Sequence, residues 1–225
     1  MSLQSLRIRN FKAVVDSKTV KLGPLTAFIG NNGAGKSSLI EALETYQAIV
    51  RDGLDAAMQR WLGIEHVRHK AQEAKERMGQ LVNPISFELA LGESPRKVRR
   101  LSMTVNNDPA ANRMLIASER ITDLAGDFTE RNVLDSMPPH GAGRSILTVP
   151  LDLGLTMVSN EVLAWQFLTL SPERMGLPVP QQRTKGAVRM ASDGSNVADF
   201  LLDLRRQDAN AFNGIVETMA FVLPY

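Results

Sequence analysis

Residues 30–37 combine glycines, a lysine and a serine in a spacing that suits the binding of phosphate groups. They read Gly30-Asn31-Asn32-Gly33-Ala34-Gly35-Lys36-Ser37, which is the complete pattern G-x-x-x-x-G-K-S. Glycine allows backbone N–H groups to converge on phosphate oxygens where a Cβ would block the approach. The ammonium of Lys36 suits the β- and γ-phosphates, and the hydroxyl of Ser37 suits Mg²⁺. The pattern predicts a site for a nucleoside triphosphate, with Lys36 as catalytic residue and Ser37 as metal ligand.

Such a loop must lie between a buried strand and the start of a helix. The apolar run Leu25-Thr26-Ala27-Phe28-Ile29 precedes it and predicts that strand. After the loop, apolar residues recur at helical spacing and predict a helix of about four turns from Lys36. These are Leu39, Ile40, Leu43, Tyr46 and Val50. The start of the helix would add unpaired N–H groups and its positive dipole end. The alternative is a glycine-rich turn that binds nothing, and the order of elements disfavours it.

A second segment, Gly141-Ala142-Gly143-Arg144-Ser145, is similar to the end of this loop. It has Pro138 at the position of the first glycine and Arg144 at the position of the lysine. The planar guanidinium of arginine does not replace a compact ammonium. We expect a flexible surface loop there.

Composition narrows the class of protein. The chain has 225 residues, of which 44% are hydrophobic, so it can form one large or two small domains. It has no cysteine, which excludes disulfides and thiolate metal sites. It lacks an apolar run of about 18 residues and a signal-peptide pattern, which predicts a cytoplasmic protein without a membrane partner. His66 and His69 fall on an expected helix, and we favour a solvated helix face over a metal site.

The formal net charge of +2 is too small to identify a nucleic-acid partner. The basic residues are nevertheless clustered, with four cations in Arg96-Lys97-Val98-Arg99-Arg100 and others on an expected polar helix. The latter are Arg68, Lys70, Lys75 and Arg77. Such a cluster suits contact with a phosphate backbone, but we favour an exposed hairpin turn and helix face.

Periodicity predicts four regions. Residues 1–51 form the strand, loop and helix core, with strands at 3–11 and 19–22, and residues 52–80 form a helical insertion. Residues 81–125 form an antiparallel β subdomain with strands at 85–91, 101–105 and 114–116. Residues 126–225 are mainly helical. Helices are expected there at 128–137, 151–164, 196–206 and 208–221, with a strand at 165–170.

Taken together, these segments resemble the heads of the RecF and SMC branch of ABC-type ATPases, including RecF-like predicted AAA-family ATPases and the ATPase part of OLD-type nucleases. Residues 6–13, Leu-Arg-Ile-Arg-Asn-Phe-Lys-Ala, resemble the first strand of those heads, and residues 23–43 match almost throughout. The segments 165–167, 170–173 and 193–198 are similar to later parts of the head. The resemblance is closest at 1–46 and weaker at 160–222.

The resemblance implies an α/β fold of P-loop NTPase type, with a mixed sheet, an antiparallel β subdomain and a helical insertion. It implies ATP and Mg²⁺ as cofactors, a head-to-head homodimer in the intact protein, and DNA as a candidate partner. It places Arg9, Asn10 and Lys12 near the base and ribose, with a capped turn as the alternative role. Contacts to ATP are expected from these three residues and from the loop: Gly30, Asn31, Asn32, Gly33, Ala34, Gly35, Lys36, Ser37 and Ser38.

The sequence also departs from that family. We find no signature motif, no apolar strand ending in Asp-Glu and no late switch histidine after the loop; Leu170-Ser171 is followed by Pro172, and Asp203 by Leu204. We therefore expect the N-terminal part of a longer ATPase, which binds ATP but hydrolyses it efficiently only with a C-terminal half and a dimer partner. The alternatives are a non-catalytic nucleotide-sensing module and, less favoured, a small-molecule kinase.

Overall fold

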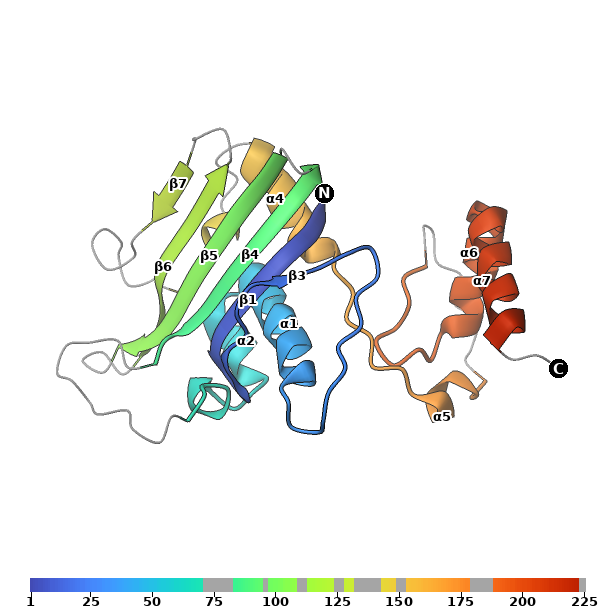
Figure 1. Ribbon diagram of the computed structural model, residues 1–225, viewed down its shortest axis with the longest axis horizontal. Coiled ribbons are helices and arrows are strands. Elements are labelled where there is room, and N and C mark those ends of the chain that lie inside the picture. Colours follow the sequence, from blue (N-terminus) through green and yellow to red (C-terminus); the bar gives the residue numbers. More distant parts are fainter. Residues whose placement is uncertain are drawn as a thin grey trace. The chain divides into compact units, whose positions relative to one another are not determined.

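The computed structural model describes residues 1–70, 83–94, 97–108, 113–123, 128–131, 143–148, 153–178 and 188–222. The chain divides into two compact units, Met1–Trp165 and Gln166–Tyr225 (Figure 1). The first unit contains a twisted sheet with helices packed on one of its faces, and the described residues of the second form three helices. The predicted division into four regions is not tested by this arrangement and stays a prediction.

The sheet of the first unit has the strand order β2-β1-β4-β5-β6-β7, with β3 also paired to β1. Its strands are β1 (Ser2–Phe11), β2 (Val14–Asp16), β3 (Val20–Lys21), β4 (Ile85–Ser94), β5 (Lys97–Asp108), β6 (Arg113–Asp123) and β7 (Phe128–Arg131). Every pairing among the described strands is antiparallel. The prediction of a mixed sheet is therefore wrong for the described part, whereas the α/β class and the antiparallel meander are confirmed.

Alternating side chains explain the two faces of this sheet. On β4, Phe87 and Leu91 are buried, while Glu88 and Ala90 between them point to the other face. An aromatic cluster packs on the buried face. In it the ring centroid of Phe87 lies 6.3 Å from that of Phe11 and 5.6 Å from that of Tyr46. The core of the first unit therefore lies between this apolar face and the helices (Figure 1).

In its described part, the first unit also has three α-helices and two short 3₁₀ helices. They are α1 (Lys36–Asp52), α2 (Leu54–Gln59), η1 (Ile64–His66), η3 (Ile146–Thr148) and α4 (Leu153–Ala164). Helix α1 is amphipathic as predicted, because Leu39, Leu43 and Tyr46 are buried. Its C-terminal half is tied to α4 by the buried amide of Gln47, which donates to the carbonyl oxygens of Val162 at 2.8 Å and Trp165 at 2.9 Å.

Three expectations about secondary structure are wrong. Residues 25–29 form no strand, and the side chains of Leu25 and Ile29 are 92% and 94% exposed. Residues 165–170 are also not a strand, although Thr169 donates to the carbonyl oxygen of Ser192 at 2.6 Å. Residues 128–131 are strand β7 rather than helix, because they pair with β6. In each case the presence or absence of a neighbouring strand decides the conformation, and the periodicity of the sequence does not report such a neighbour.

The segment 52–80 is only partly described. Helix α2 and η1 agree with helical structure, whereas Arg68 forms an isolated bridge with Phe11 and Lys70 is not helical, so both residues lie off the predicted polar helix. Residues 71–82, with Lys75 and Arg77, lie outside the described residues. His66 ends η1, whereas His69 follows it, so the two histidines do not share one helix face.

The second unit contains α5 (Pro172–Met175), α6 (Val197–Gln207) and α7 (Ala209–Val222). Helices α6 and α7 agree with the prediction to within about one residue at each end. They pack against one another, and Arg205 lies over the ring of Phe212 at 5.7 Å from its centroid. Several apolar side chains of α7, including Val216 and Met219, are about half exposed.

Candidate functional site

The loop 30–37 adopts a conformation that its glycines permit. Gly33 and Gly35 have φ angles of +83° and +88°, which side chains with a Cβ rarely adopt. Gly35 is the N-cap of α1, so the loop runs directly into the helix. A Cβ built on Gly35 would lie 3.1 Å from Cγ2 of Val14. The loop therefore needs glycine at position 35 for its backbone angle and for its contact with the segment after β1.

Lys36 points back into the loop. Its ammonium donates hydrogen bonds to the carbonyl oxygens of Gly30 at 2.7 Å and Asn31 at 2.8 Å. These bonds use two of the three donors of a lysine ammonium, so a third remains for an anionic ligand. The neighbouring residues 29–34 are all exposed to solvent. The positive charge is thus held at the loop while the loop stays open to solvent.

The start of α1 supplies further donors. The N–H of Leu39 donates to the carbonyl oxygen of Gly35 at 3.1 Å, which leaves the N–H groups of Lys36, Ser37 and Ser38 outside the helical hydrogen-bond ladder. The first turn of α1 carries no acidic residue that would compete for them. Ser37 is exposed and Ser38 is buried. The hydroxyl of Ser37 is therefore accessible to a ligand, whereas Ser38 packs inward.

Three further predicted contacts, Arg9, Asn10 and Lys12, lie at the end of β1. A side-chain nitrogen of Arg9 is 2.9 Å from a carboxylate oxygen of Glu88, and Nδ2 of Asn10 donates to the carbonyl oxygen of Pro84 at 3.0 Å. Both side chains are thus directed to β4 and to the residue before it. Their role as nucleotide contacts stays a prediction.

Lys12 links the end of β1 to helix α1 and to the segment just after α2. Its Nζ lies 2.9 Å from Oε2 of Glu41 on α1 and 3.4 Å from the centroid of the Trp61 ring, just beyond α2. Nε1 of Trp61 in turn donates to Oγ1 of Thr45 at 3.0 Å. Sequence reasoning missed this cluster, because no local pattern links position 12 with position 61. The next residues, Ala13 and Val14, are those that approach Gly35.

The turn between β1 and β2 is kept in place by backbone bonds and by an ion pair. Lys12 donates its N–H to the carbonyl oxygen of Val67 at 2.6 Å. Farther along, Arg7 forms a two-pronged ion pair with Asp16, at 3.0 and 2.8 Å. The hydrogen bonds from Arg7 and from the backbone N–H of Lys18 hold the pKa of the Asp16 carboxyl well below its usual range. These contacts fix the segment against which the phosphate loop packs.

The similar segment near residue 143 is not a surface loop throughout. Residues 141 and 142, and Pro138, lie outside the described residues, and Arg144 is exposed. Ser145 is fully buried, and its hydroxyl donates to Oε1 of Glu119 at 2.6 Å. The other oxygen of Glu119 accepts the N–H of Ile146 at 2.7 Å. This serine therefore anchors η3 to β6, and the expectation of a flexible loop is wrong at this residue.

The loop offers the donors that a triphosphate with Mg²⁺ requires. Backbone N–H groups at a helix start and one ammonium suit phosphate oxygens, and a serine hydroxyl suits a cation that otherwise binds water and phosphate. Within the described ranges, His, Asp and Glu residues form no group of three or more that could hold a metal ion. The other ligands of a Mg²⁺ ion at Ser37 would be phosphate oxygens and water. Helices long and apolar enough to cross a membrane are absent from the described part of the chain.

Comparison with known proteins agrees with this geometry. None of the curated proteins matches the chain. A family model described as "AAA ATPase domain" matches residues 1–94, which include β1, the loop 30–37, α1, α2 and all of β4. The match covers 94 of the 225 residues, and for this part of the chain it supports an AAA-type ATPase family.

Proposed function

We propose that this chain binds ATP with Mg²⁺ at residues 30–38 and is the ATP-binding portion of an ATPase. The observation that carries the proposal is the position of Lys36. Its ammonium is held 2.7 and 2.8 Å from two loop carbonyl oxygens, directly before the unpaired N–H groups of α1. Positive charge and N–H donors thus converge where a β- or γ-phosphate would lie.

Hydrolysis needs groups beyond this loop. A water molecule must be oriented by a carboxylate or amide, and the charge of the γ-phosphate must be stabilised on its far side. The acidic residue of α1 nearest the loop in sequence is Glu41, which is bonded to Lys12. We infer that the missing groups come from a further part of the protein and from a second head, in a head-to-head dimer of RecF/SMC type. We propose that this ATPase acts in DNA repair, in other DNA transactions or in phage defence.

The ion pair between Glu41 and Lys12 also favours a second function, because it occupies the acidic residue of α1 nearest the loop. A module that binds ATP and passes its occupancy to a partner needs no carboxylate beside the nucleotide. Such a nucleotide sensor would bind Mg-ATP with the same loop and release it unchanged. The two functions predict different rates of ATP hydrolysis once the dimer, or the complex with a partner, has formed.

The test is equilibrium binding of Mg-ATP to the chain and to Lys36→Ala, with Lys21→Ala as the control. Lys21 is an exposed lysine on β3, so its replacement changes the charge equally. We expect Lys36→Ala to lose at least tenfold in affinity and Lys21→Ala to bind normally. Unchanged binding by Lys36→Ala would disprove the site. Efficient hydrolysis by the isolated chain would disprove the need for groups supplied from elsewhere.

A further inference from the structure

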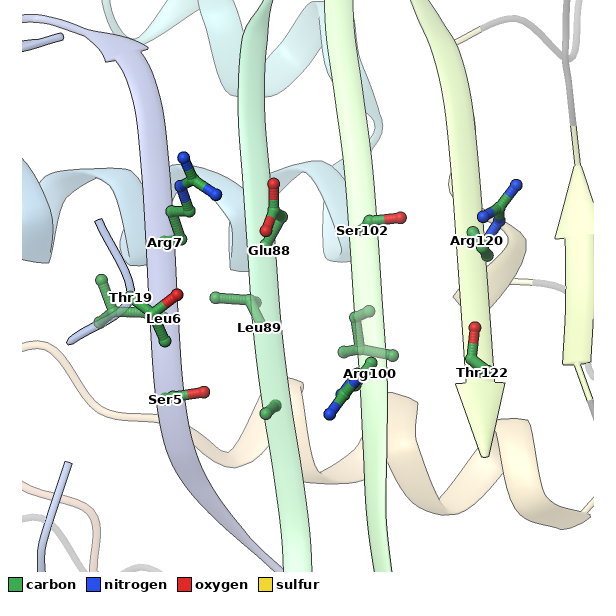
Figure 2. Close-up of a pocket in the computed structure, with 12 residues that line it drawn as sticks. Ser5, Leu6, Arg7, Thr19, Glu88, Leu89, Arg100, Ser102, Arg120 and Thr122 are labelled. Atoms are coloured by element: carbon green, nitrogen blue, oxygen red, sulfur yellow. The ribbon is translucent and has the colours of Figure 1, made fainter. Parts of the chain in front are cut away.

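The face of the sheet that points away from the helices carries a shallow hollow of about 410 Å³. Four strands, β1, β4, β5 and β6, form its floor, and Thr19 before β3 contributes to its rim (Figure 2). The lining side chains on this face are mainly arginines and hydroxyl residues. They are Ser5, Arg7, Thr19, Glu88, Ala90, Arg100, Ser102, Arg120 and Thr122. We call this surface the open face.

Strand register places these residues in two rows. Arg7 is opposite Glu88, Glu88 is opposite Ser102, and Ser102 is opposite Arg120, so one row crosses four strands. In the adjacent row Ala90 is opposite Arg100. Arg100 is in turn opposite Thr122 (Figure 2). The small side chain of Ala90 leaves the floor low at its own position in this row. Neighbouring strands are about 4.8 Å apart, so the rows span roughly 15 Å.

The charge of the open face is positive. Its described cations are Arg7, Arg9, Lys21, Arg100 and Arg120, whereas its carboxylates are Asp16, Glu88 and, by register, Glu130 of β7 opposite Arg120. Asp16 is engaged by Arg7 and Glu88 by Arg9. The surplus of cations over carboxylates favours an anionic ligand.

Arg100 is the strongest single indication. It is exposed, and its guanidinium makes no hydrogen bond or ion pair within the part of the chain that the structure describes. Its neighbour Arg99 points to the other face and donates to the carbonyl oxygen of Gly154 on α4. The pleat of β5 therefore separates the basic cluster seen in the sequence, and only one of these two arginines faces the hollow.

The lining chemistry identifies the kind of anion. Arginine and hydroxyl groups are the donors that contact phosphate oxygens in nucleic acids. The twelve residues that line the hollow include no aromatic side chain, whereas surfaces for single strands use aromatic rings to stack bases. A small-molecule site would also enclose its ligand between apolar walls, whereas this hollow is a shallow depression on one face of the sheet. These features favour a polymer that presents phosphates on a continuous outer surface.

We propose that the open face binds the phosphate backbone of double-stranded DNA, with Arg100 and the row from Arg7 to Arg120 as contacts. The proposal locates the surface for the DNA role proposed above, and it does not depend on the phosphate loop. Binding through phosphates releases counterions, so the affinity must fall with salt and must show little preference for sequence.

The experiment measures binding of a fluorescent 20-base-pair duplex by the full chain at two or more salt concentrations. The variant is Arg100→Glu, and the control is Arg144→Glu. Arg144 is equally exposed, makes no described hydrogen bond or ion pair, and precedes Ser145, which packs against the helix-covered face of the sheet. We expect Arg100→Glu to lower the affinity at least tenfold and to reduce the salt slope by about 1, and Arg144→Glu to bind as the unmodified chain does.

A second variant, Ser102→Glu, adds a negative charge to the floor of the hollow without removing a cation, and we expect a similar loss. Thermal unfolding of each variant checks that the fold is retained. All measurements are repeated without nucleotide in the Lys36→Ala chain, so that failure of the ATP site and failure of the DNA surface are distinguishable. Equal losses for Arg100→Glu and Arg144→Glu, tighter binding of single-stranded DNA, or no duplex binding would overturn the proposal.

Discussion

The ammonium of Lys12 lies 3.4 Å from the ring centroid of Trp61, and its other partner is the carboxylate of Glu41. This contact joins the end of the first strand to the region beyond α2. Since Glu41 belongs to the helix that starts at the phosphate loop, the contact positions that helix against the sheet. It also gives Lys12 a structural role that competes with its predicted contact to the nucleotide.

Replacement of Lys12 by alanine tests which role dominates. We expect the free energy of unfolding to fall by about 1 kcal/mol, because a cation–π contact and a half-buried ion pair are lost. Denaturant unfolding measures this change, and fluorescence reports the new surroundings of Trp61. The affinity for Mg-ATP should stay within twofold of that of the unmodified chain. A large loss of affinity with unchanged stability would instead assign Lys12 to the nucleotide.

Gly33 and Gly35, two of the three loop glycines with positive φ, make a matched pair. Gly33→Ala introduces backbone strain only, because nothing lies within 4 Å of the added Cβ. Gly35→Ala adds the same strain and a 3.1 Å contact with Val14. We expect a loss of about 1 kcal/mol for Gly33→Ala and a larger loss for Gly35→Ala, measured by thermal unfolding. Equal losses would show that Val14 moves away without cost.

Acid should weaken the attachment of β2 to β1 through Asp16. The folded state lowers the pKa of this carboxyl, so the ion pair with Arg7 contributes its full stability above the unfolded pKa of about 3.9. That contribution is lost as the pH falls through the folded pKa. Asp16→Asn should therefore be less stable than the unmodified chain at pH 7, with the difference shrinking below about pH 4. Unfolding at several pH values tests this, and a difference independent of pH would contradict it.

Much of the first unit could be predicted from local patterns. The alternation of Ile85, Phe87, Leu89 and Leu91 predicted β4, and helical spacing from Leu39 to Val50 predicted α1, because one buried face imposes its period on the sequence. The strand expected at Leu25–Ile29 shows the limit of this reasoning. An apolar run indicates that a segment can be buried, but a strand also needs a neighbour for its backbone groups, and no described strand pairs with it.

The sequence by itself predicted the glycine-rich loop 30–37 as a phosphate site, since glycine, lysine and serine at fixed spacing lie in one short segment whose chemistry depends on local backbone geometry. Only the tertiary structure decided what surrounds it. The pairing of Lys12 with Trp61, the anchoring of Ser145 by Glu119, and the separation of Arg99 from Arg100 all depend on which strands and helices meet. Contacts between residues far apart in the chain follow from packing and register, which a local pattern does not encode.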